Sequence, residues 1–145
     1  MCRGEAARIY AQKNAFDALG CKLVCVLKEG LPAEVAEFKD NYWRDELYLD
    51  KEMGFFKAVA GGKVKKGNLS TFLNPFSTVW KRVTEAKEAG VQTQNLNGEG
   101  KILGGLLVMR PGSRGVEYQF QERNFGDSAP VEDVLKAVEA AASAK

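Results

Sequence analysis

The stretch that decides the fold reads ILGGLLVMRPGSRGVEYQFQ and covers residues 102–121 of this 145-residue chain. Its first part, Ile102–Met109, is continuously apolar, which is typical of a buried strand. After the turn at 111–115, apolar and polar residues alternate, and this predicts a second strand paired with the first. A final helix is indicated from about Pro130. Its apolar residues repeat at helical spacing, namely Val131, Val134, Leu135 and Val138.

The chain before this hairpin predicts parallel strand–helix units. Residues 3–19 have the apolar spacing of a helix. Leu23–Leu27 is a short apolar run that follows at once, as a buried parallel strand does. Pro32 opens a short helix, and Glu46–Leu49 predicts a second strand. No linker divides the chain, so we expect a single α/β domain over residues 1–145.

Two more helices are expected between these units and the hairpin. Asp50 predicts the N-cap of a helix from Lys51 to about Val59. The longest helix is predicted at 69–89. Its apolar residues recur at helical spacing, namely Phe72, Phe76, Val79, Val83 and Ala86. We expect Trp80 and the phenylalanines of this helix to lie in the core rather than to stack on a cofactor, and we expect Trp43 to be partly exposed.

Composition argues against several classes of function. A net charge of +2 is too small to indicate binding to nucleic acid or to an anionic membrane. No apolar run approaches the ~20 residues that span a bilayer. The chain has no histidine, which removes Ser-His-Asp and Cys-His catalysis and the commonest metal ligand. We therefore expect no metal, no bound cofactor, no nucleic acid and no membrane insertion.

The three cysteines, Cys2, Cys21 and Cys25, are typical of an intracellular reducing compartment, because they are odd in number and lack zinc-ligand spacing. Cys2 directly precedes the first predicted helical turn, where free N–H groups stabilise a thiolate, and Arg3 adds a cation. The site is therefore suited to a reactive cysteine. The alternative, an ordinary residue at a frayed chain end, agrees about equally well with the local sequence.

Cys21 and Cys25 are expected to be structural. The predicted first helix separates Cys21 from Cys2 by roughly 25 Å, at ~1.5 Å per residue. The strand to Cys25 returns only about 13 Å, at ~3.3 Å per residue. Both separations exceed the ~7 Å between Cα atoms that a disulfide can bridge. The chain alone is therefore predicted to have no internal dithiol and little or no dithiol turnover.

Short stretches of the chain match a known family, namely Cys2–Ala6, Glu46–Asp50, Asn95–Gly105 and Phe125–Asp127. They resemble the peroxiredoxin-like 2 family of AhpC/TSA-like redox proteins, which includes prostamide/prostaglandin F synthase. The resemblance implies an α/β fold, a thioredoxin-like three-layer sandwich with a mixed sheet. In the family's Cys-x-x-Cys-Arg motif, Cys2 and Arg3 match the second cysteine and the arginine. The resemblance therefore implies that Cys2 and Arg3 are catalytic.

The same resemblance implies a gap in the sheet. The first cysteine of the motif, and the strand before it, would lie before Met1. In the family's fold that strand lies between Leu23–Leu27 and Ile102–Met109, and the chain offers no spare strand for the place. Buried backbone groups left unpaired cost ~1–3 kcal/mol each. We expect residues upstream of Met1, or a partner protein, to supply a strand beside Leu23–Leu27.

Two functions stay open on this basis. The first is a thiol oxidoreductase that acts on small molecules or protein disulfides, with Cys2 as its resolving thiol. The second is a non-catalytic thioredoxin-like subunit of a larger assembly, such as a chloroplast complex. Either function would be carried out in a reducing compartment, the cytoplasm or a plastid. Whether the chain is an enzyme is not decided by its residues.

Overall fold

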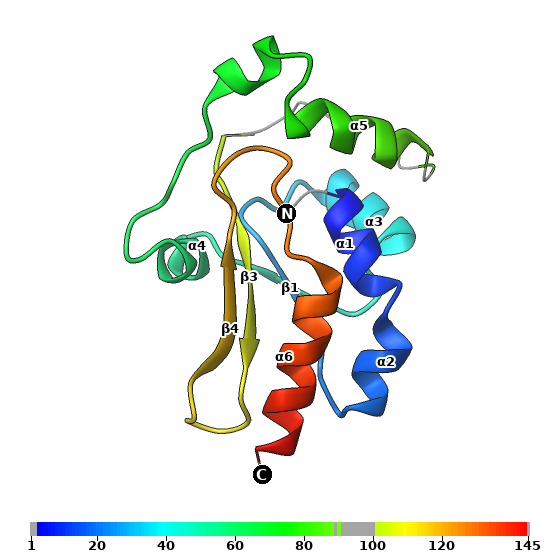
Figure 1. The fold of residues 1–145 in the computed structure, drawn as a ribbon, viewed down its shortest axis with the longest axis vertical. Helices are drawn as coiled ribbons and strands as arrows, with labels where there is room; N and C mark the ends of the chain where they lie inside the picture. Colours follow the sequence, from blue (N-terminus) through cyan, green and yellow to red (C-terminus); the bar gives the residue numbers. More distant parts are fainter. Residues whose placement is uncertain (1–2, 89, 91–100, 145) are drawn as a thin grey trace.

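The computed structural model describes residues 3–88, 90 and 101–144, and Figure 1 shows the arrangement of their helices and strands. The elements are, in chain order, α1 (Arg3–Tyr10), α2 (Lys13–Ala18), β1 (Val24–Leu27), α3 (Pro32–Asn41), β2 (Glu46–Leu49), α4 (Gly54–Val59), the 3₁₀ helix η1 (Leu69–Leu73), α5 (Thr78–Glu88), β3 (Gly105–Met109), β4 (Val116–Gln121) and α6 (Val131–Ser143). Cys2 lies outside the described residues, and so does the part of the family-matching stretch that covers 95–100.

The strands form two separate pairs. β1 and β2 are parallel, with Cys25 opposite Leu47. β3 and β4 are antiparallel, with Val108 opposite Tyr118 and an irregularity just after Val108. Within the described ranges, no ladder joins β1 to β3. The expected mixed sheet is therefore present as two halves, and the two strands that were expected to flank a missing neighbour are not paired with each other.

Helices cover both faces of the β3–β4 pair, as a three-layer arrangement requires. Val108 and Tyr118 lie in the hydrophobic core with Val134 of α6. Gln119, the next residue along β4, points to the other face, where its Nε2 donates a 2.8 Å hydrogen bond to the backbone oxygen of Val59 at the end of α4. Figure 1 shows α6 and α4 on opposite sides of the pair.

The buried core includes one residue that was expected to be partly exposed. The largest fully buried side chains are Trp43, Phe16, Val59 and Cys25. The expectation of exposure for Trp43 is wrong because its indole finds partners inside the protein. Nε1 donates a 3.2 Å hydrogen bond to the backbone oxygen of Glu46, and the ring centroid lies 5.4 Å from that of Tyr10. A tryptophan whose N–H is bonded can be buried without an unsatisfied donor.

The expected helix over 3–19 is two helices, α1 and α2. The backbone N–H of Gln12 donates to the oxygen of Ile9, three residues back, and this tighter turn separates the two helices. Lys13 then begins α2, and its Nζ lies 3.1 Å from a carboxylate oxygen of Asp45, in the loop before β2. No glycine or proline marks this point in the sequence. The tertiary ion pair is a contact that helical periodicity does not encode.

The expected helix over 69–89 is wrong for a reason that the sequence did contain. Pro75 interrupts it, and the residue before this proline is extended, with φ −96° and ψ 109°. The α-helical region is disfavoured for a residue that precedes proline. The chain therefore forms η1 and α5, and the aromatic stripe is not in the core: Phe76 is 95% exposed, and Phe72 and Trp80 are exposed as well.

Other boundaries shift by a few residues. The N-cap residue of α4 is Met53 and not Asp50, and α4 begins at Gly54, later than expected. The Asp50 carboxylate nevertheless accepts hydrogen bonds from the N–H groups of Gly54 and Phe55, at 2.9 and 2.8 Å, in the first turn of α4. Strand β3 begins at Gly105 instead of Ile102, and Ile102 forms an isolated antiparallel bridge with Lys66. No helix in the described part of the chain is long and apolar enough to cross a membrane.

Candidate functional site

Arg3 is the first residue of α1 and is held by α3. Its guanidinium donates two hydrogen bonds to the two carboxylate oxygens of Glu37, at 2.9 and 3.2 Å. The guanidinium carbon lies 5.7 Å from the ring centroid of Tyr42. The Arg3 side chain is 11% exposed and that of Glu37 34%. This two-pronged ion pair fixes the start of α1, the residue directly after Cys2, against α3.

Two buried carboxyl groups lie close to the same helix end. Glu5, in the first turn of α1, is buried, and its Oε1 accepts a 3.1 Å hydrogen bond from the backbone N–H of Ala129. Glu122 is also buried and accepts a 2.6 Å bond from the N–H of Gly104. Burial, and then the charge of Glu122, raise the pKa of Glu5. Glu5 is therefore a carboxyl group that binds its proton more tightly than an exposed one.

Sequence reasoning did not single out Glu5, although a signal was present. Glu5 lies four residues before Ile9, and residues spaced by four share one face of a helix. Ile9 and Ala6 face the core. A carboxylate on a core-facing helix position is uncommon, because burial of a charge is costly unless the charge is compensated. That position could have been noted as a candidate for a perturbed pKa.

The described cysteines are not activated. Cys25 is fully buried in β1, and burial raises the pKa of its thiol to about 11. Cys21 is half-buried, and burial together with the charge of Asp17 raises its pKa. Both are free thiols. The expectation that Cys25 is buried is confirmed, and both thiols form a thiolate less readily than an ordinary cysteine.

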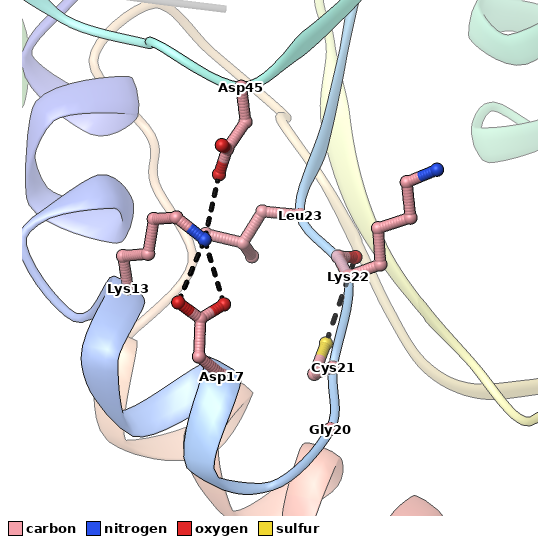
Figure 2. Close-up of a pocket in the computed structure, with 7 residues that line it drawn as sticks. All are labelled: Lys13, Asp17, Gly20, Cys21, Lys22, Leu23 and Asp45. Atoms are coloured by element: carbon pink, nitrogen blue, oxygen red, sulfur yellow. Dashed lines mark hydrogen bonds and ion pairs between the residues drawn. The ribbon is translucent and has the colours of Figure 1, made fainter.

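The surface next to Cys21 is a shallow pocket of ≈ 310 Å³, which Figure 2 shows in close-up. Lys13 Nζ lies between two carboxylates in it, 2.7 Å from an oxygen of Asp17 and 3.1 Å from one of Asp45. These bonds, first to Asp17 and then to Asp45, raise the pKa of Lys13 to about 12. The Cys21 sulfur contacts the backbone oxygen of Lys22 at 3.9 Å. Because the Lys13 ammonium group is already paired with Asp17 and Asp45, it does not stabilise a thiolate at Cys21.

A second, larger cavity of ≈ 580 Å³ lies between the two strand pairs, and we call it the interstrand cavity. Val24 and Val26 of β1 line one side, and residues 104–109, which include β3, line the other. Helices contribute further apolar walls through Phe16, Phe56, Val134 and Val138. The cavity therefore lies where the sheet was expected to lack a strand.

The residues described by the structure include no group of three or more Cys, Asp and Glu side chains placed to hold a metal ion. The chemistry available at the start of α1 is thus that of Arg3, its carboxylate partner Glu37, and buried Glu5, next to the thiol of Cys2 in the sequence. Such a constellation can support thiol–disulfide exchange, in which a positively polarised helix end stabilises a thiolate.

The sequence profile of the AhpC/TSA antioxidant enzyme family matches residues 8–124. Among curated proteins, the chain is 36% identical to "Peroxiredoxin-like 2A" of Danio rerio, over 94% of this chain and 61% of that protein. It is 35% identical to the protein of the same name from Bos taurus, over 94% of this chain and 59% of the relative. It is 34% identical to "Peroxiredoxin-like 2A" of Homo sapiens, over 94% of this chain and 56% of that protein. No solved structure matches the chain.

These matches confirm the resemblance to the peroxiredoxin-like 2 family and, with it, the thioredoxin-like α/β fold. The chain spans about 60% of the length of the curated relatives it matches. The profile match begins at residue 8, C-terminal to Cys2 and Arg3. The roles of Cys2 and Arg3 therefore stay predictions.

Proposed function

Because this chain belongs to the AhpC/TSA antioxidant enzyme family, we propose that it acts as a thiol oxidoreductase through Cys2. The observation that supports the proposal most directly is the anchoring of α1. Arg3 and Glu37 fix the helix start, and Cys2 is the residue immediately before it. The first N–H groups of a helix have no partner within it, and the helix dipole is positive there, so a thiolate is stabilised.

The chemical step is thiol–disulfide exchange. In this proposal Cys2 is the attacking thiol rather than a resolving one: its thiolate attacks one sulfur of a substrate disulfide, forms a mixed disulfide and expels the other sulfur as a thiolate. An external dithiol then attacks the Cys2 sulfur and releases the second substrate thiol. The remaining thiol of the external dithiol then attacks the dithiol sulfur that is bonded to Cys2, which forms a disulfide within the dithiol and releases the Cys2 thiolate. The substrate disulfide gains two electrons and the external dithiol loses two, so the dithiol reductant supplies what Cys2 alone lacks.

Arg3 acts in this proposal as a positioning residue. Its guanidinium is already engaged with the Glu37 carboxylate, so most of its charge is balanced within the protein. Its contribution is to hold the first turn of α1 in place rather than to contact the substrate. Lysine, which is a point charge without a planar fork, would not reproduce the two-pronged bond.

The test is a trapping experiment with glutathione disulfide, read by mass spectrometry of the adduct. We expect one mixed disulfide, on Cys2, which Cys2→Ser abolishes. Cys21→Ser is the matched control, because this thiol is partly exposed yet has a raised pKa, and it should leave the adduct unchanged. An adduct that forms first on Cys21 or Cys25, or that survives Cys2→Ser, would overturn the proposal.

A second candidate function is a non-catalytic thioredoxin-like subunit of a larger assembly, in the cytoplasm or in a plastid. The two cysteines that the structure describes favour it, because the pKa values of both Cys21 and Cys25 are raised by burial and neither thiol is activated. Purification of the natural protein from its source, followed by cross-linking mass spectrometry, separates the two. A stable partner that stays bound to the Cys2→Ser variant supports the function as a non-catalytic subunit. A protein that is isolated as a monomer and forms only mixed disulfides through Cys2 supports the function as a thiol oxidoreductase.

A further inference from the structure

Exposed apolar side chains gather on η1, α5 and the turn between them. Ten large apolar side chains are exposed in the described part of the chain, and four of them fall between residues 72 and 80. Leu73 is 85% exposed and Phe76 95%, whereas Phe72 and Trp80 are 42% and 44% exposed. Single exposed apolar side chains are normal, but a group of neighbouring ones indicates an interaction site. We call these four residues the η1–α5 surface, and Figure 1 shows its two helices, in green, at the opposite end of the molecule from the C-terminus.

The backbone that carries this surface is fixed by its own hydrogen bonds. The side-chain oxygen of Asn68 accepts a 3.0 Å bond from the N–H of Ser70 and caps η1. Asn74 Oδ1 accepts a 3.0 Å bond from the N–H of Phe76, across Pro75. An asparagine side chain that bonds the backbone two residues further on stabilises a turn. The exposure of Phe76 is therefore a property of a defined turn.

Trp80 connects the two helices and keeps part of its ring exposed. Its Nε1 donates a 3.2 Å hydrogen bond to the backbone oxygen of Phe72. The centroid of the Phe72 ring lies 5.4 Å from that of Phe125, which follows β4. Because the indole N–H already has a partner within the chain, the exposed part of the Trp80 ring can leave water without the loss of a hydrogen bond.

Positive charge is concentrated in the same part of the chain. Residues 63–88 contain six basic and two acidic residues, a net charge of +4, whereas the whole chain carries +2 and the other residues together carry −2. The small net charge of the whole chain conceals this distribution. Lys81 and Lys87 are exposed on α5, the helix that also carries Trp80. Tryptophan and phenylalanine combined with lysines on a helix are typical of segments that lie on an anionic lipid surface.

A lipid surface fits these features better than a protein partner does. Lysine is depleted at protein–protein interfaces, whereas anionic lipids attract it. Leu73 and Phe76 protrude almost completely, so they can enter the boundary between headgroups and acyl chains, which needs no preformed pocket on the other side. This argument does not depend on the proposed activity of Cys2.

We propose that the η1–α5 surface binds reversibly to the surface of bilayers that contain anionic phospholipids. Leu73, Phe76 and the exposed part of the Trp80 ring enter the headgroup boundary. The lysines of α5 contact the anionic headgroups. The molecule is thereby held on the membrane surface by side chains and not by a spanning helix.

The experiment uses the natural full-length protein, so that any segment beyond residues 1–145 is present and can cover the surface if it does so. Vesicles contain phosphatidylcholine alone or phosphatidylcholine with phosphatidylserine, and binding is measured by co-sedimentation. We expect binding to the vesicles with phosphatidylserine, weakened as the salt concentration rises, and little binding to the others. Lipids with brominated acyl chains should quench fluorescence, and Trp80→Phe should remove this quenching, because Trp43 is only 2% exposed.

Matched variants localise the contact. Leu73→Ser changes a leucine of the η1–α5 surface, and Leu31→Ser changes one that is 41% exposed directly before α3. Lys81→Gln and Lys39→Gln each remove an exposed helical lysine, from α5 and from α3. We expect Leu73→Ser to weaken binding to the anionic vesicles by roughly tenfold or more and Lys81→Gln by roughly fivefold. The two α3 controls should bind as the wild type does.

Equal binding to both kinds of vesicle, equal effects of the paired variants, or no lipid quenching that depends on Trp80 would overturn the proposal. Self-association that shields Trp80 without lipid would overturn it in favour of a second copy of the chain. A Leu73→Ser variant that loses a protein partner but binds vesicles as the wild type does would overturn it in favour of a protein interface.

Discussion

Arg3→Met and Glu37→Gln, made singly and together, measure how firmly α1 is anchored to α3. The two hydrogen bonds of 2.9 and 3.2 Å are charge-assisted, and the arginine is the more buried partner. Exposed ion pairs contribute ~0.2–1 kcal/mol, and hydrogen bonds to charged groups ~1.5–3 kcal/mol. Partial burial places this pair between the two ranges, so we expect a coupling energy of ~1–2 kcal/mol.

The single variants should differ as well. Arg3→Met removes the contact with the Tyr42 ring together with the ion pair, whereas Glu37→Gln leaves the cation–π contact intact. Such a contact contributes ~0.5–1 kcal/mol at a partly exposed site. Arg3→Met should therefore destabilise the protein more than Glu37→Gln by about that amount.

Urea unfolding followed by circular dichroism gives the four free energies of unfolding. The exposed Lys22–Glu46 pair, with 68% and 44% side-chain exposure, is the control, and its coupling should fall in the range of ~0.2–1 kcal/mol. Sites that do not interact are additive within ~0.3–0.5 kcal/mol. A coupling of that size or less for Arg3 and Glu37 would refute the view that this pair fixes the start of α1.

Two other substitutions test the packing and the buried acid. Gly105→Ala should destabilise the protein by ~1–3 kcal/mol in urea unfolding, because its Cβ would lie 2.3 Å from the backbone oxygen of Phe120 and 2.4 Å from Val59 Cγ1. Gly54→Ala, whose Cβ has its nearest neighbour at 3.8 Å, should be neutral or stabilising, and equal effects would argue against the clash. Glu5→Gln tests the pH dependence of stability. Burial raises the pKa of Glu5 in the folded protein above its ordinary 4.5, so between the unfolded and the folded pKa the folded state binds more protons than the unfolded state. The free energy of unfolding of the wild type therefore falls as pH rises through that window. The variant should lose this dependence and gain stability over wild type with rising pH, and parallel pH profiles of the two proteins would contradict the argument.

The elements that sequence patterns predicted correctly are those that local rules determine. The alternation in residues 116–121 predicted β4, and the apolar stripe from Val131 predicted α6. The placement of β1 and β3 apart, with a space between them, followed from the family resemblance rather than from periodicity. Pro75 lies inside the helix that apolar spacing predicted over 69–89. Because the residue before a proline disfavours the α-helical region, Pro75 indicates the break between η1 and α5.

Other features depend on contacts between distant parts of the chain. The break at Gln12 accompanies an ion pair between Lys13 and Asp45. The burial of Trp43 depends on a backbone oxygen in β2. The anchoring of Arg3 by α3 could not be predicted, because no local rule relates the two helices. Sequence patterns thus identified the candidate thiol and arginine but not the groups that surround them.

The most direct test of the central claim is the pH dependence of alkylation at each cysteine, measured by mass spectrometry on the native chain. A thiol at the N-terminus of an anchored helix should titrate below the ordinary value of ~8.5, because the thiolate is stabilised there. We expect Cys2 to react with a midpoint below that value, and to react faster at neutral pH than Cys21 and Cys25, whose pKa values are raised. A Cys2 midpoint at or above ~8.5 would contradict the account, because the helix end would then provide no activation.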